Sequence, residues 1–412
     1  MAMSIVFKPK NYSLLFLDMD SFFASVEQQV QPTLREIPVG VAPYTGDTGC
    51  IIAASKEAKK LGIKTGCLVG DAKKIYPKIK IVESRPALYS IYHKEIKKVL
   101  EKITPFYQPL SIDEFSVKLS PREQNQVSAK NIAIKIKDQI KNQVGDWLTC
   151  SIGVGPNRFL AKMAGESRKP DGITILSIEK IAEFYKSLKS LRDITGINYK
   201  MEENLKKINI NSPISLYNCS LDYLKRYLKH WGRLWYFRLR GYEIDEYSTP
   251  AKSISHSHVL APELRNKQGA QAVLRKLLFK IGYRLRDKKY KAKGICVYIR
   301  FYNRQGFKKT ISVPPFFDDF SLQKHTFKIL EDCDWDSIPS FVYASVYNLE
   351  SNYQKQINLF DKYEKIGRIS RALDDISKTY GPDSIIPASL IGYFETAPDR
   401  ISFGSPNYEI RS

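Results

Sequence analysis

Residues 13–28 read SLLFLDMDSFFASVEQ, a stretch in which an apolar run ends in two aspartates, Asp18 and Asp20. The run SLLFL predicts a buried strand, and the spacing of the apolar residues in FFASVEQQV predicts a helix directly after it. A strand followed at once by a helix is typical of the opening of an α/β layer. Because an unpartnered buried carboxylate is costly, such strand-end acids are expected to be paired, hydrogen-bonded or bound to a cation.

A second acidic point lies within apolar sequence, at Asp113 and Glu114 in FYQPLSIDEFSVKL, residues 106–119. This segment predicts a strand pair, or a strand with a tight corner at its acidic centre. If it lies beside the first strand, three or four carboxylates converge. Oxygen ligands without His or Cys suit Mg²⁺ or Mn²⁺ and an in-line phosphoryl transfer. On spacing alone, acids that cap helices or lie on the surface remain an equal alternative.

The composition bounds the class of protein. At 412 residues the chain predicts three or four domains, and a net charge of +22 with a globular hydrophobic content favours a polyanionic partner, most simply nucleic acid. A merely basic protein remains the alternative. The six cysteines form no C-x-x-C pair, which argues against a zinc module. No stretch is apolar enough to span a bilayer, so we expect a cytoplasmic protein without a membrane partner.

The element pattern changes along the chain in a way that predicts separate domains. A small unit with strands and a short helix follows the first helix, and further helices and an apolar strand come after it. Short helical patterns then dominate before a β-α-β-β-α-β order appears. These regions are, in turn, residues 32–83, 87–169, 177–245 and 252–350.

Basic residues gather in three places. Lys56, Lys59 and Lys60 share one short predicted helix, and Lys162, Arg168 and Lys169 follow the apolar strand at 148–155. Any of them could hold a triphosphate as a point charge. The predicted helix at 263–288 and the turn after it carry many cations, which favours contact with a phosphate backbone over a plain solvated face.

Three ordered motifs make the chain similar to a known family. DMDSFFASVEQ, PLSIDEF and SIGVGPNRFLAKMA, the last followed by RKPDGI, resemble the motif set of the Y-family DNA polymerases, the translesion group, and in particular the bacterial DNA polymerase IV and mutagenesis-polymerase group. The resemblance extends in domain order to about residue 350. It implies an α+β multidomain right hand whose parts are a palm (1–30 and 84–175), small fingers (31–83), a helical thumb with a helix-hairpin-helix (176–246), a β-α-β-β-α-β little finger (251–350) and a C-terminal tail (351–412).

The resemblance assigns the acids. It implies that Asp18, Asp113 and Glu114 are catalytic and bind two Mg²⁺ ions, with Mn²⁺ as a possible substitute. The backbone carbonyl of Met19 is expected to join these metal ligands. Asp20 is not a metal ligand in the family, and a turn straight into the helix would break the strand alternation that otherwise sets it beside Asp18.

The resemblance also assigns contacts to the incoming nucleotide. Phe23 matches the steric gate that excludes a 2′-hydroxyl, and Phe22 lies beside it. Lys56, Lys59 and Lys169 are expected to contact the triphosphate. The family commonly has Tyr and Arg where this chain has Lys56 and Lys59, so bidentate phosphate recognition by a guanidinium is lost there.

DNA contacts are expected from the thumb and the little finger. The thumb hairpin commonly reads Gly-Ile-Gly, and here it reads Gly196, Ile197, Asn198. Since Asn tolerates a left-handed backbone, the turn is expected to survive and to offer N–H groups to a phosphate. In the little finger and its entry, the expected DNA contacts are Lys252, Arg284 and Arg286.

QINLFD, at residues 356–361, resembles the sliding-clamp-binding peptide of bacterial replication proteins, with Gln356, Leu359 and Phe360 as anchors. A plain linker with two apolar residues is the alternative.

Together these features predict a monomeric, low-fidelity DNA-templated DNA polymerase acting in DNA repair and damage tolerance, with primer-template DNA, dNTPs and a sliding clamp as partners. A catalytically inactive polymerase-like scaffold that binds DNA and the clamp is the rival hypothesis. A reverse transcriptase or an RNA-making polymerase is a second rival.

Overall fold

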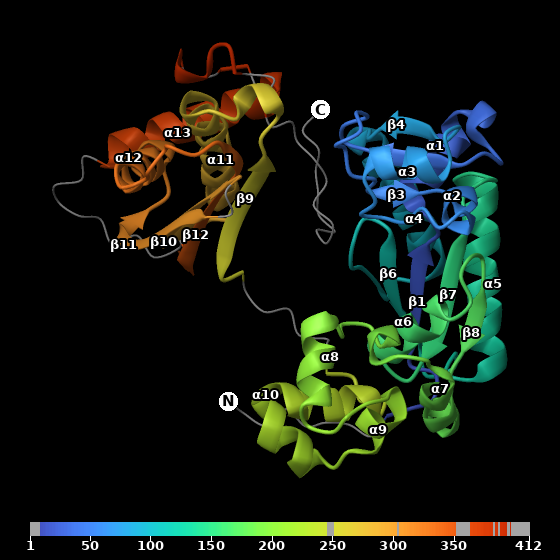
Figure 1. Cartoon of the computed structure of the whole chain (residues 1–412). Coiled ribbons are helices and arrows are strands. Elements are labelled where there is room, and N and C mark those ends of the chain that lie inside the picture. Colours follow the sequence, from blue (N-terminus) through green and yellow to red (C-terminus); the bar gives the residue numbers. More distant parts are fainter. Residues whose placement is uncertain are drawn as a thin grey trace. The chain divides into compact units, whose positions relative to one another are not determined.

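The computed structural model describes residues 9–244, 251–302, 305–351, 363–381, 384–385, 388–393 and 396. The chain divides into two compact units, whose long continuous parts are Met1–Tyr247 and Ser248–Arg400. Figure 1 shows their helices and strands. No helix within the described ranges is long and apolar enough to cross a membrane.

A five-stranded sheet forms the centre of the first unit (Figure 1). Strand β1 lies in the middle and pairs antiparallel with β6 on one side and β7 on the other. Its residues are almost all buried, as the apolar run predicted. The sheet order is β5-β6-β1-β7-β8, with bounds Tyr107–Pro109, Glu114–Lys118, Leu14–Met19, Cys150–Gly155 and Ile173–Ile175.

Helices cover both faces of this sheet. Leu15 and Leu17 share a core with α1 (Phe22–Val30), α4 (Pro86–Ile103) and α5 (Gln126–Gln143). Helix α6 (Arg158–Glu166) packs against β1 and β7. Its Lys162 lies over the ring of Phe16, whose neighbours Leu15 and Leu17 face the other core, so α6 covers the opposite face.

Gly153 of β7 lets α6 approach the sheet closely. A Cβ atom at this position would lie 1.9 Å from the carbonyl oxygen of Ala161 in α6. No real side chain fits at that distance, so only glycine permits this packing.

The turn between β1 and α1 has a left-handed residue. Ser21 has φ 50° and ψ 41°, a region that non-glycine residues rarely adopt. The strand therefore ends abruptly at this point, and its side-chain alternation ends with it.

A three-stranded sheet follows within the same unit. Its order is β3-β2-β4, with bounds Ala53–Ala54, Val39–Ala42 and Lys80–Glu83. The helix predicted from KEAKKLG is α2 (Lys56–Lys60). A further helix, α3 (Val69–Ile75), was not predicted. The turn η1 (Pro32–Leu34) leads into this region.

Short helices make up the rest of the first unit, as their pattern predicted. They are α7 (Ile181–Ser187), α8 (Tyr199–Lys206), α9 (Pro213–Asn218) and α10 (Leu221–Leu239), with the 3-10 turns Ile178–Lys180 and Leu191–Asp193. Helix α10 is kinked at Lys229, where φ is 52°. Their apolar residues pack with Phe159, Leu160 and Met163 of α6 in one core.

The second unit has the predicted β-α-β-β-α-β order. Its sheet order is β11-β10-β12-β9, and α11 and α12 pack on one face of it (Figure 1). Helix α13 (Tyr363–Tyr380) and the 3-10 turn Ala388–Leu390 follow. The other bounds are β9 Ser253–Val259, the 3-10 turn Pro262–Leu264, α11 Lys267–Asp287, β10 Tyr290–Phe301, β11 Gly306–Phe316, α12 Asp319–Leu330 and β12 Pro339–Ser351.

Candidate active site

The two acidic points of the sequence lie side by side in the first unit. The register of β1 and β6 sets Asp18 directly opposite Glu114. Directly opposed residues point to the same face of a sheet, so both carboxylates lie on one face. Asp113 immediately precedes β6, and its carbonyl accepts a hydrogen bond from the Met19 N–H at 2.9 Å. The two acidic points of the sequence therefore converge.

Two lysines neutralise two of these carboxylates. Lys169 Nζ lies 2.7 Å from Asp18 Oδ2, and Lys162 Nζ donates to Glu114 Oε1 at 2.6 Å. Lys162 comes from α6, whereas Lys169 lies in the loop before β8. The Lys162 and Lys169 side chains are 24% and 35% exposed, so neither is closed off from water. An ammonium group that is a single point charge can exchange one anionic partner for another.

Burial and crowding raise the pKa of two carboxyls in this group. The pKa of Asp18 is raised to about 6, first by burial and further by the charges of Asp113 and Glu114, while Lys169 opposes the rise. Burial also raises the pKa of Asp113, against a hydrogen bond from Ser111. These carboxylates are thus short of positive charge, which is the condition under which a site gains from binding a cation.

Ser111 holds the corner between β5 and β6 and was not predicted. Its hydroxyl donates to Asp113 Oδ1 at 2.6 Å and accepts from the Glu114 N–H at 3.1 Å. A serine just before an acidic pair at a predicted corner is a recognisable turn signal, because its hydroxyl can bond the backbone two or three residues on.

Asp20 lies outside the carboxylate group despite its position two residues after Asp18. Its side chain accepts hydrogen bonds from Thr149 Oγ1 at 2.8 Å, Ser151 Oγ at 2.7 Å and the Asp171 N–H at 2.8 Å. It is 4% exposed. Asp20 therefore ties the end of β1 to β7 and to the loop that carries Lys169.

The carboxylates where β1 ends and β6 begins are of a kind that binds a hard divalent cation. In this structure, however, Asp18 and Glu114 are paired with Lys169 and Lys162. Carboxylate oxygens are the ligands that Mg²⁺ prefers, and this group contains three carboxylates, those of Asp18, Asp113 and Glu114. Within the described residues, no group of three or more His, Cys, Asp or Glu side chains is arranged to hold a metal ion. Asp18 and Glu114 would have to leave Lys169 and Lys162 to do so.

Phe23 is buried in the first turn of α1 and stacks on a residue that the sequence did not single out. The rings of Phe23 and Tyr89 lie 4.3 Å apart with an interplanar angle of 14°. Phe22 packs next to Phe23 at 5.8 Å. Tyr89 comes from α4, so one helix supports an aromatic residue of another.

Tyr89 is itself fixed by a buried carboxylate. Its hydroxyl donates to Glu27 Oε1 at 2.7 Å, and the Arg85 guanidinium donates to both oxygens of Glu27. Glu27 is fully buried, and the pKa of Tyr89 is raised chiefly by burial. The partners are about 60 positions apart in sequence, and no local pattern connects them.

Of the two predicted lysines of α2, Lys59 is coupled to the acids. Its side chain is exposed overall, yet partial burial of the ammonium group lowers its pKa, and Lys169 lowers it further. Asp20, Asp18 and Asp113 act in the opposite direction. Lys59 therefore lies within electrostatic reach of the carboxylate group. Lys56 begins the same helix.

The predicted thumb turn is present, but the reason given for Asn198 is wrong. Gly196 is the left-handed residue, with φ 90°, and Ile197 is buried in the core that the short helices form with α6. Asn198 is extended, at φ −91° and ψ 176°, and its side chain caps α8 by accepting from the Met201 N–H at 2.9 Å. Asparagine is favoured at this position as a helix cap.

Arg286 does not lie on an open surface, contrary to its predicted DNA contact. Its side chain is 7% exposed, bonds both oxygens of Asp374 in α13 at 2.6 and 2.8 Å, and lies 3.0 Å from Asp319. These two acids compensate part of the positive charge of α11. Lys252 is exposed just before β9, and Arg284 is half-buried in the last turn of α11.

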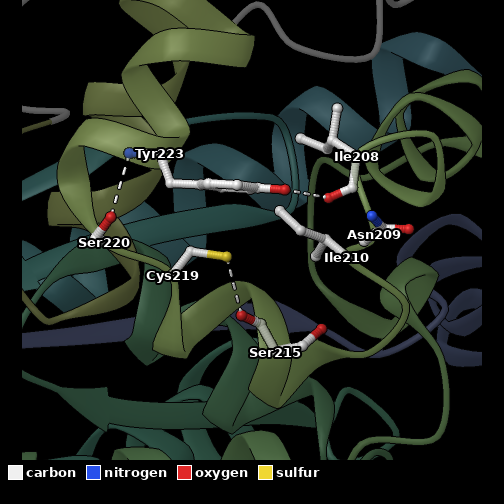
Figure 2. A pocket seen from close by; sticks show the side chains of 7 residues that line it. All are labelled: Ile208, Asn209, Ile210, Ser215, Cys219, Ser220 and Tyr223. Atoms are coloured by element: carbon white, nitrogen blue, oxygen red, sulfur yellow. Dashed lines mark hydrogen bonds between the residues drawn. The ribbon is translucent and has the colours of Figure 1, made fainter.

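The clamp-like peptide, with Gln356, Leu359 and Phe360, lies outside the described residues. A pocket of about 270 Å³ opens in the helical part of the first unit, between Ile208, Cys219 and Tyr223 (Figure 2). There the Tyr223 hydroxyl donates to the Ile208 carbonyl at 2.8 Å. None of the predicted site residues lines this pocket.

Comparison with known proteins agrees with this geometry. Residues 17–166 match the model of the impB/mucB/samB family, and residues 251–359 match the model of the impB/mucB/samB family C-terminal domain. The chain is 30% identical over 379 residues to DNA polymerase IV of Moorella thermoacetica, covering 90% of this chain and 94% of that protein. It is 29% identical to DNA polymerase IV of Pelotomaculum thermopropionicum, covering 91% and 94%.

The fold has a solved counterpart. A Y-family DNA polymerase chimera superimposes with a TM-score of 0.70 at 23% identity, over 82% of this chain and 99% of the chimera. The α+β multidomain polymerase fold is thereby confirmed. The chain belongs to the impB/mucB/samB family and is a Y-family DNA-directed DNA polymerase similar to DNA polymerase IV.

Proposed function

We propose that this chain is a translesion polymerase that copies a DNA template during damage tolerance, adding dNTPs to a primer 3′-hydroxyl by two-metal phosphoryl transfer. One observation carries the proposal: the carboxylates of Asp18, Asp113 and Glu114 converge where β1 ends and β6 begins, within electrostatic reach of Lys59 and Lys169. Acids and cations of this kind match a reaction that binds a metal–triphosphate complex.

The acids and lysines have complementary roles in this proposal. Asp18, Asp113, Glu114 and the Met19 carbonyl are the proposed ligands of two Mg²⁺ ions, with Mn²⁺ as a possible substitute. When bound, these ions would activate the primer hydroxyl and neutralise charge on the phosphate oxygens. As Asp18 turns to the cations, Lys169 becomes available to the triphosphate. Lys59 and Lys56 would hold the same group from the side of α2.

Phe23 is the proposed steric gate, and Phe22 its neighbour against the sugar. Support comes from the stacking of Phe23 on Tyr89, which Glu27 and Arg85 hold in place. A gate excludes a 2′-hydroxyl only if its ring cannot yield, and a ring stacked on a fixed neighbour meets that requirement. We expect Phe23→Ala to raise ribonucleotide incorporation. Unchanged dNTP/NTP selectivity would count against this role.

DNA contacts are proposed at the Gly196–Ile197 backbone, at Lys252 and on the sheet of the second unit. Helices α11 and α12 cover one face of that sheet. On the other face Tyr298 lies opposite Lys308 across β10 and β11, and Arg300 lies two residues along β10. This face is a better candidate than the helix carrying Arg284 and Arg286.

The regions named from the resemblance keep their proposed roles: palm, 1–30 and 84–175; fingers, 31–83; thumb, 176–246; little finger, 251–350; tail, 351–412. We also propose that Gln356, Leu359 and Phe360 bind a sliding clamp and that the enzyme is a monomer. Truncating Leu359 and Phe360 to alanine should abolish clamp pull-down while sparing distributive synthesis. Clamp binding that persists in this variant would show that the peptide is not the clamp-binding site.

Primer extension with Mg²⁺ tests the main proposal. The wild type should add dNTPs to a DNA primer on a DNA template, and Asp113→Ala with Glu114→Ala should not. Equal extension by both proteins would rule out a catalytic role for Asp113 and Glu114. No extension by the wild type would favour the inactive-scaffold hypothesis. RNA templates and NTP substrates, run in parallel, test the reverse-transcriptase and RNA-making alternatives.

A further inference from the structure

One buried glutamine, Gln28, joins three segments at the base of the proposed fingers. It lies in α1 and is 1% exposed. Its amide nitrogen lies within hydrogen-bonding distance of the carbonyls of Leu34, at 3.0 Å, and Ile37, at 3.4 Å. These two carbonyls belong to the connection between α1 and β2, so Gln28 holds the entry into the fingers.

The same amide reaches the helix that carries the candidate triphosphate lysines. Gln28 Nε2 donates to Glu57 Oε2 at 3.1 Å, and Glu57 lies in α2 between Lys56 and Lys59. Gln28 thus connects α2 to the helix that begins at Phe22, directly after the end of β1.

A tryptophan from the loop between α5 and β7 completes the contact. Trp147 Nε1 donates to Gln28 Oε1 at 3.1 Å, and the Trp147 N–H donates to Gln29 Oε1 at 2.8 Å. Arg35 lies over the Trp147 ring at 5.1 Å and pairs with Asp146 at 3.1 Å. Every polar atom of the Gln28 side chain is therefore used.

We propose that Gln28 is a positioning residue for the incoming nucleotide, because it fixes α2, and with it Lys59, relative to the palm carboxylates. This inference rests on the proposed function, in which Lys59 contacts the triphosphate. Helix α2 has only five residues, so its placement depends on contacts with the rest of the fold, of which Gln28–Glu57 joins it to α1. Placement errors near 1 Å suffice to weaken such contacts strongly.

The test separates binding from chemistry in single-nucleotide incorporation. Gln28→Leu keeps the volume of the side chain and removes its polar contacts. We expect the KM for the correct dNTP to rise about tenfold, with kcat within about twofold of wild type, because α2 is misplaced while the carboxylates are untouched. Hydrogen exchange of the full-length protein should show faster exchange in the peptide that contains α2.

A matched pair at Glu57 covers the case in which Gln28→Leu does not fold. Glu57→Gln and Glu57→Ala both remove the charge, but only the glutamine keeps an acceptor for the Gln28 amide. We expect Glu57→Ala to raise the KM about tenfold and Glu57→Gln to behave as wild type. Asp146→Asn breaks the exposed ion pair of the same region without touching α2, and it should leave the KM unchanged.

The outcomes distinguish this inference from the proposed function. If the wild type extends a primer but Glu57→Ala and Gln28→Leu keep a wild-type KM, or lose kcat alone, Gln28 is not a positioning residue. An equal rise in KM for Glu57→Gln or Asp146→Asn would also overturn it, because the effect would not depend on the amide contact. Failure of the wild type to extend any primer overturns the proposed function instead.

Discussion

The chain contains two groups of paired acids and cations that differ in construction. In the five-stranded sheet of the first unit, Asp18 and Glu114 are held by lysines whose side chains are 24% to 35% exposed. In the second unit, Arg286 lies between Asp319 and Asp374, and all three side chains are at most 13% exposed. The first group can exchange its partners with a ligand, whereas the second is closed to water and ligands.

The difference shows how an ionic group for binding is distinguished from one for structure. A guanidinium that bonds both oxygens of a carboxylate is fixed in direction, and burial makes its separation costly. Single lysine contacts at a half-open site are weak and reversible. Both groups contain acids. They differ in whether the cation is a lysine or an arginine and in how exposed the side chains are.

The largest expected effect lies at the open group. Asp18→Asn should lower the rate of nucleotide incorporation more than about 10³-fold, because a proposed metal ligand is lost. The same change should leave thermal stability unchanged or slightly higher, since it removes a buried charge while Lys169 can return to water. Single-turnover incorporation and thermal unfolding of the same preparation measure both. A large loss of stability would place Asp18 with the structural group.

The closed group should respond in the opposite way. Arg286→Met leaves two acids buried without their cation, which should destabilise the second unit by about 3 to 5 kcal/mol. Hydrogen exchange of peptides from α11 and α13 would report this loss. Arg284→Met, in the same helical turn, is the control and should change exchange little. Protection equal to wild type in Arg286→Met would show that the ion pairs add nothing.

The pH dependence of the closed group follows from Asp319. Burial raises its pKa to about 6, while Arg286 opposes the rise and Asp374 and Asp318 add to it. A pKa raised above the unfolded value of 3.8 means that the folded state binds the proton more tightly. Protonation of Asp319 therefore stabilises the folded state. This stabilisation is complete below pH 3.8 and is lost as pH rises through 6, by about 1 to 3 kcal/mol.

Asp319→Asn should remove that pH dependence from the exchange of α11 and α12, because asparagine does not titrate. Comparison of wild type and variant at pH 5 and pH 7 measures it. A wild-type dependence that persists in the variant would assign the titration to another group.

The smallest effect is expected at Lys169. Lys169→Met should raise the KM for dNTPs about tenfold, or about 1.4 kcal/mol, because one point charge on the triphosphate is lost. Lys169→Arg keeps the charge and should recover part of the affinity. If Lys169→Met and wild type have the same KM, the lysine belongs to Asp18 alone and the open group is not an exchangeable one.

Sequence reasoning located the acids of the open group because Asp18 ends an apolar run and Asp113 and Glu114 interrupt another, and it expected them to converge if the two strands were neighbours. It did not locate the partners that tertiary packing supplies. Tyr89 lies 66 positions after Phe23, and Asp374 lies 88 positions after Arg286. Local patterns carry no information on such pairs.

The basic helix illustrates the same limit. Counting cations on α11 gave a phosphate-binding surface because the acids of α12 and α13 were not visible beside it. Asn198 was misinterpreted for a local reason. A tolerance for left-handed backbone was assumed, but the residue is extended and its side chain caps α8.

Gly153 has a consequence for how mutations in this enzyme would be detected. Since α6 rests on β7 without an intervening Cβ, the bulk of one methyl group at position 153 would push α6, and Lys162 with it, away from Glu114. A substitution at Gly153 would change a residue that only packs against α6. It would nevertheless first be noticed as a polymerase with altered nucleotide insertion. Screens for fidelity variants can therefore return residues that never contact DNA.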